Sequence, residues 1–219
     1  MDRSNVVEIL PERVANVSST SYPSHHPDHS GAWDFEEFKQ NLRVNVTRWT
    51  TDLCGFDLVG VDASIANAIR RVLIAEVPSV AIEHVYIWNN TSIIQDEVLS
   101  HRLGLIPLAI DPRKLSFKMD DEANDQNTVV FNLKADCWKN GNSKDATVEG
   151  RYVYSSQLEW DPKGDQAETM ADSPPRPVNQ DIVIAKLAPG QGMEMELHCE
   201  KGIGKDHAKF SPVATATYR

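Results

Sequence analysis

The chain has 219 residues, 41% of them hydrophobic and 25% charged, which is the composition of an ordinary globular protein. Its formal net charge of −10 argues against direct sequence-specific binding to nucleic acid, because such binding needs clustered Lys and Arg to displace counterions from phosphates. No apolar run approaches the roughly 20 residues of a membrane helix, so we expect no membrane association. Three widely spaced cysteines argue against a disulfide framework and fit a reducing compartment.

Residues 1–33 are predicted to form a flexible tail. The segment 17–31 is rich in Ser, Pro and His and shows no hydrophobic periodicity. Its three histidines are candidate metal ligands by residue type, but a mobile tract offers a metal no preformed geometry. We therefore expect a polar tail and no metal site there.

The segment that follows indicates a β-hairpin. Leu42, Val44 and Val46 alternate with polar residues and predict a first strand, and the apolar residues from Phe56 to Val61 predict a second. The stretch Thr51–Gly55 between them suits a turn. Alternation of this kind is typical of a strand with one buried face, so the first strand is predicted to be half-buried.

A helix is predicted over Ser64–Glu76. Asp62 or Ser64 can cap its first turn by accepting a hydrogen bond from a free backbone N–H, and Pro78 ends it. One apolar stripe recurs at helical spacing, formed by Ile65, Ile69, Val72 and Leu73. A stripe of this kind predicts packing against another element.

The remainder of the chain reads mainly as strands. A second short helix is predicted from Asp96, as its cap, to Arg102, with Gly104 just beyond its end. Loops are predicted at Met170–Asn179 and Lys201–Lys209. Strands are predicted at Val80–Trp88, Val129–Cys137, Arg151–Trp160, Ile182–Leu187, Met193–Cys199 and Val213–Tyr218. This order predicts an α+β fold with a largely antiparallel sheet.

Two groups of residues suggest chemistry. Cys199 with His198 or His207 is the remote alternative of a Cys/His hydrolase, although adjacent strand residues such as His198 and Cys199 point to opposite faces. The run Lys201–Lys205, K-G-I-G-K, lacks the spacing of a phosphate-binding loop, so a turn is the simpler use of its glycines. We expect no catalytic and no metal-binding residue.

Three longer motifs resemble the α-like subunits of cellular RNA polymerases. They are S-I-A-N-A-I-R-R-V-L-I-A-E-V-P, then W-N-N-T-S-I-I-Q-D-E-V-L-S-H-R-L-G-L-I-P-L, then K-G-I-G-K-D-H-A-K-F-S-P-V-A-T-A-T-Y-R. The resemblance is closest to the larger α-like subunits shared by the eukaryotic RNA polymerases I and III. It implies a non-catalytic scaffold without cofactors, which acts in the nucleus, including the nucleolus, in transcription of ribosomal, 5S and transfer RNA.

The resemblance also implies partners and their sites. A small α-like subunit would form a heterodimer with this chain, and the pair would nucleate assembly of the large catalytic subunits. The stripe Ile65, Ile69, Val72 and Leu73 would be the dimer interface. Asn67, Arg70 and Arg71 would contact a large subunit, with Arg71 foremost.

The family's organisation implies a split dimerisation domain. Residues 34–78 would be its first segment, of strands and a long helix, and 79–219 an inserted, mainly antiparallel β-rich domain. The returning segment with a second long helix is absent from the 219 residues, so we weigh a truncated regulatory or dominant-negative isoform that cannot dimerise. The polymerase II counterparts carry a cysteine cluster where Ala109–Val130 has no cysteine, so we expect no zinc or iron–sulfur cluster.

Overall fold

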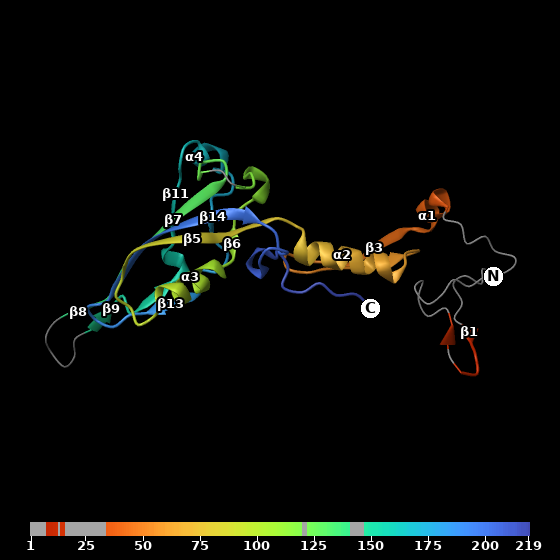
Figure 1. Ribbon diagram of the computed structural model, residues 1–219, viewed down its shortest axis with the longest axis horizontal. Coiled ribbons are helices and arrows are strands. Elements are labelled where there is room, and N and C mark those ends of the chain that lie inside the picture. Colours follow the sequence, from red (N-terminus) through yellow and green to blue (C-terminus); the bar gives the residue numbers. More distant parts are fainter. Residues whose placement is uncertain (1–7, 13, 16–33, 120–121, 141–146) are drawn as a thin grey trace. The chain divides into compact units, whose positions relative to one another are not determined.

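The computed structural model describes residues 8–12, 14–15, 34–119, 122–140 and 147–219 (Figure 1). All strand pairs within these residues are antiparallel, and the α+β class is confirmed. The α-helices are α1 (Phe35–Asn41), α2 (Ala63–Ala75), α3 (Asp96–Gly104) and α4 (Gln166–Thr169). The strands are β1 (Glu8–Ile9), β2 (Val14–Ala15), β3 (Arg43–Trp49), β4 (Cys54–Val59), β5 (Ser79–Asn90), β6 (Leu108–Ala109), β7 (Thr128–Asp136), β8 (Trp138–Asn140), β9 (Thr147–Glu149), β10 (Tyr152–Tyr154), β11 (Glu159–Asp161), β12 (Arg176–Pro177), β13 (Val183–Lys186) and β14 (Gly192–Gly202).

The chain forms two compact units. One comprises Met1–Val72 with Ala216–Arg219, and the other comprises Leu73–Thr215. The predicted division into 1–33, 34–78 and 79–219 stays a prediction. Most of the predicted tail lies outside the described residues, and its described part contains the two-stranded pair β1–β2.

The first unit contains a helix that the sequence analysis missed. The Asp34 carboxylate caps α1 by accepting hydrogen bonds from the backbone N–H groups of Glu36, at 2.8 Å, and Glu37, at 3.2 Å. Because α1 has only seven residues and no buried side chain, it gives almost no periodic signal.

The predicted hairpin is confirmed as β3 and β4, but the predicted half-burial of its first strand is wrong. Val44 pairs with Leu58 and Val46 with Phe56, so these four side chains share one face. Every residue of β3 is exposed, with Val44 at 56% and Val46 at 58% of full exposure. Alternation indicates that one face is apolar, and no described part of the chain covers that face.

Helix α2 confirms the predicted helix. The Asp62 carboxylate accepts a hydrogen bond from the Ser64 backbone N–H at 2.8 Å, and the Asp62 carbonyl accepts one from Ile65 N–H at 3.0 Å. Asp62 is therefore the capping residue, whereas Ser64 lies inside the helix. The helix ends three residues before Pro78.

The second unit is built on a four-stranded sheet in the order β11–β7–β14–β5. The long strands β5, β7 and β14 confirm three of the predicted strands, and they run alongside one another in Figure 1. Alternate residues of β7 and β14, such as Phe131, Leu133, Met195 and Leu197, enter one buried core. Helix α3 adds Leu99 and Leu103 to that core, which places α3 on the inner face of the sheet.

Several local predictions differ from the structure. The strand predicted at Arg151–Trp160 is two strands, β10 and β11, separated by a 3₁₀ turn at Ser155–Gln157. Backbone N–H groups of Ser155 and Ser156 bond to carbonyls in the chain before β13, and this long-range pairing interrupts the strand. The predicted loop Met170–Asn179 contributes β12, which pairs with β6. The predicted strand Val213–Tyr218 is irregular.

The ends of α3 also differ from the prediction. Asp96 is the first helical residue and Gln95 occupies the cap position, where its side chain forms no capping hydrogen bond. The Asp96 carboxylate instead accepts a hydrogen bond from the Asn90 side chain at 2.6 Å. Gly104 is the last helical residue. A Cβ atom there would lie 3.3 Å from the Ile82 carbonyl oxygen, so close packing on β5 favours glycine.

Candidate assembly surface

Helix α2 carries all seven residues that the sequence analysis singled out. None of its residues is fully buried. Within the predicted stripe, Ile65, Ile69 and Leu73 are half-buried and Val72 is 42% exposed. An apolar stripe of this kind normally gains its stability by burial, so its exposure leaves hydrophobic free energy to be gained by contact with another element.

The polar residues of α2 are organised by a local hydrogen bond. The Asn67 side-chain oxygen accepts hydrogen bonds from Arg70 Nε at 3.1 Å and Arg70 Nη2 at 3.0 Å. Arg70 is half-buried and held in one orientation, whereas the following Arg71 is exposed. With about 3.6 residues per turn, Arg71 lies on the side of α2 away from the apolar stripe, so the two sets of residues can contact different partners.

The hairpin has a second exposed apolar face. The sequence predicted the strands but not the exposure of this face. Its side chains include Val44, Val46 and Phe56, all more than one-third exposed. The alternation was visible in the sequence. It identified an apolar face but contained no information on whether that face is covered within the chain or by a partner.

The Cys/His hydrolase alternative is not supported. Cys199 is fully buried in the core of the sheet, and burial, reinforced by the charge of Glu200, raises the pKa of its thiol far above the usual range. His198 lies on the opposite face, where its Nε2 is 2.7 Å from a carboxylate oxygen of Glu196. A nucleophile needs an accessible thiolate with a base in reach, and this arrangement provides neither.

The glycines of K-G-I-G-K serve close packing. A Cβ atom at Gly202 would lie 2.7 Å from the Phe210 ring, and one at Gly204 would collide with the Ile74 carbonyl near the end of α2. The adjacent Lys205 N–H donates a hydrogen bond to the Ala75 carbonyl at 2.8 Å. The loop therefore satisfies a carbonyl at the helix end. Gly204 lies in the predicted turn, whereas Gly202 is the last residue of β14.

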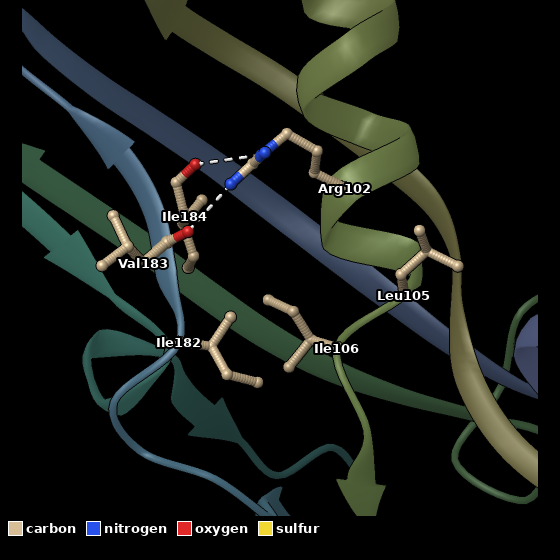
Figure 2. Close-up of a pocket in the computed structure, with 6 residues that line it drawn as sticks. All are labelled: Arg102, Leu105, Ile106, Ile182, Val183 and Ile184. Carbon is tan, nitrogen blue, oxygen red and sulfur yellow. Dashed lines mark hydrogen bonds between the residues drawn. The ribbon is translucent and has the colours of Figure 1, made fainter. Parts of the chain in front are cut away.

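One cavity among the described residues is small and apolar (Figure 2). It has a volume of about 180 Å³ and lies between the end of α3 and the segment Ile182–Ile184. Arg102 is its only charged lining residue, and its guanidinium donates hydrogen bonds to the carbonyls of Val183 at 2.9 Å and Ile184 at 3.3 Å. With its charged group engaged in this way, the cavity offers no acid, base or nucleophile.

Within the described ranges, no group of three or more His, Cys, Asp or Glu side chains is arranged to hold a metal ion. Among the described residues, no helix is both long enough and apolar enough to cross a membrane.

Comparison with known proteins identifies the family. The family model described as "RNA polymerase Rpb3/RpoA insert domain" matches residues 85–214, which make up most of the second unit. The chain belongs to the Rpb3/RpoA family of RNA polymerase α-type subunits. The match covers β7, β11 and β14 completely and the second half of β5, so this sheet is the framework of the insert domain.

Individual relatives extend the similarity to almost the whole chain. The chain is 44% identical to "DNA-directed RNA polymerases I and III subunit RPAC1" of Saccharomyces cerevisiae, over 99% of its own length and 68% of the relative's. It is 47% identical to the Mus musculus protein of that name, over 94% and 62%, and 44% identical to the Homo sapiens protein, over 100% and 68%. This chain of the Rpb3/RpoA family thus spans roughly two-thirds of the length of these relatives, and α2 lies within the shared part.

Proposed function

We propose that this chain is a non-catalytic assembly subunit of the nuclear DNA-directed RNA polymerases I and III. It forms a heterodimer with a small α-like subunit, and the heterodimer organises the large catalytic subunits. The observation that carries the proposal is the 44–47% identity, over nearly the whole chain, to relatives named as subunits of these two polymerases. The same similarity supports a nuclear location, and we propose that the nucleolus is included.

The structure supports an assembly role in a second way. The exposed stripe of α2 and the exposed apolar face of β3 and β4 are surfaces that a soluble chain normally covers. We assign Ile65, Ile69, Val72 and Leu73 to the interface with the small α-like subunit. Asn67, Arg70 and Arg71, on the polar side of the helix, are assigned to a large subunit.

The test is native mass spectrometry of this chain co-expressed with the small α-like subunit. We expect a 1:1 complex with the unchanged chain. Ile69→Asp and Leu73→Asp each place a charge in the proposed interface, so each is expected to weaken pairing by about a hundredfold or more. Ser64→Asp is the matched control, because it adds the same charge to an exposed position off the stripe.

The outcomes separate the alternatives. Unchanged pairing of both stripe variants would contradict the interface assignment. If the unchanged chain does not pair but still binds a large subunit, the regulatory isoform that cannot dimerise becomes the better description.

A further inference from the structure

The outer face of the insert-domain sheet carries an exposed aromatic pair. Along β5, Val85 and Ile87 pack on the core, so Tyr86 and Trp88 point to the opposite side. Tyr86 is 48% exposed and Trp88 is 71% exposed. Trp88 lies at a β-bulge, where Ile87 pairs with Met195 and Asn89 with Glu194, and bulges often redirect a side chain. The exposure of both rings is therefore a consequence of the strand pattern.

Carboxylates surround this aromatic pair. Strand register places Glu159, Asn132, Glu196 and Tyr86 in one row across all four strands. The next row contains Lys134 and Glu194, which form an ion pair at 3.1 Å. The side chains of Glu194 and Glu196 are 47% and 31% exposed, so both remain accessible to a partner. These rows contain three glutamates and one lysine, and the adjacent ion pair of Lys163 with Asp161 is neutral, so this part of the sheet carries more negative than positive charge.

The surface is also held in place before any partner arrives. The Tyr86 ring contacts the His198 ring edge-on at a centroid distance of 4.8 Å. His198 in turn bonds to Glu196 at 2.7 Å. A rigid aromatic side chain loses little conformational entropy on binding, which is why such residues often anchor interfaces.

We infer that the face formed by Tyr86, Trp88, Glu194 and Glu196 is a docking surface for an extended, arginine- or lysine-bearing segment of a partner protein. Cations bind both to the faces of Trp and Tyr rings and to carboxylates, so one basic side chain can use both kinds of group. Nucleic acid is disfavoured here because phosphates would face carboxylates. A second copy of this chain would likewise bring like charges together. The surface shares no residue with α2, so this inference does not rest on the proposed heterodimer.

The test is isothermal titration calorimetry of the 219-residue chain with a synthetic peptide that alternates arginine and serine. We expect saturable binding. The double variant Tyr86→Ala/Trp88→Ala is expected to weaken this binding about five- to tenfold or more, which is the scale of lost cation–π contacts. Trp88→Leu, which keeps apolar volume but removes the ring face, and Glu196→Gln should each give part of that loss. An unchanged circular dichroism spectrum shows that each variant is folded.

Matched controls distinguish binding at this surface from nonspecific electrostatic attraction between a basic peptide and an acidic protein. Trp138 on β8 is 51% exposed and pairs with Glu149, so Trp138→Ala removes a comparable aromatic residue next to a glutamate. We expect Trp138→Ala to bind the peptide as the unchanged chain does, and a glutamate–serine peptide not to bind. The inference is overturned by absent binding, by equal affinity in the double variant, or by single-stranded DNA that competes for the same site.

Discussion

At the scale of single residues, burial determines which cysteine can react. Cys54 is exposed, whereas Cys137 and Cys199 are buried in the second unit. Since alkylation requires a thiolate, and burial raises the pKa of Cys199, raising the pH through the usual thiol range leaves the native Cys199 protonated. We expect iodoacetamide to modify Cys54 alone in the native chain, as measured by mass spectrometry of the intact protein and its peptides.

The control for this prediction is the same reaction in denaturant, where all three thiols should be modified. Rapid native modification of Cys199 at mildly alkaline pH would show that the sheet core opens readily. It would also restore the Cys/His hydrolase as an alternative.

At the scale of elements, the strands predicted most accurately are those whose alternate side chains are buried in one shared core. Every second residue is buried from Val129 to Ala135 in β7 and from Met193 to Cys199 in β14, so alternation located both strands. The failures lie where a distant partner decides the conformation. The break between β10 and β11 depends on hydrogen bonds to the chain near Ile182 and Gln180. A hydrogen-bond partner that is distant in sequence gives no signal in the residues of the strand itself.

The contact between α3 and β13 gives a prediction at this scale. Arg102 joins the two elements by hydrogen bonds to two carbonyls of β13, so Arg102→Ala is expected to lower the free energy of unfolding by about 1–2 kcal/mol. The measurement is urea-induced unfolding followed by circular dichroism. Arg113→Ala is the control, because the Arg113 guanidinium bonds only to the nearby Asp111 on the surface. Equal stability of Arg102→Ala and the unchanged chain would mean that water replaces both hydrogen bonds without loss.

At the scale of the whole molecule, the candidate assembly surface was only partly predictable. The stripe of α2 was visible because its residues recur at helical spacing, and the arginines stood out by their type. The apolar face around Val44 and Val46 was mistaken for a half-buried one, because alternation looks the same whether a core or a partner covers it. A subunit that exists to be assembled has part of its core in another chain, and one sequence cannot identify that part.

Arg71 provides the prediction that separates two stages of assembly. It is exposed on α2 and lies away from the apolar stripe, so Arg71→Glu should leave pairing with the small α-like subunit unchanged. Binding of the preformed heterodimer to a large catalytic subunit should weaken by about tenfold or more, because the proposed contact would then bring together groups chosen for a positive charge and a negative side chain. Surface plasmon resonance with immobilised large subunit measures this, and Lys186→Glu on β13 is the matched charge reversal in the other unit. If the Arg71→Glu heterodimer binds as tightly as the Lys186→Glu heterodimer, Arg71 makes no such contact, and the polar side of α2 loses its assigned role.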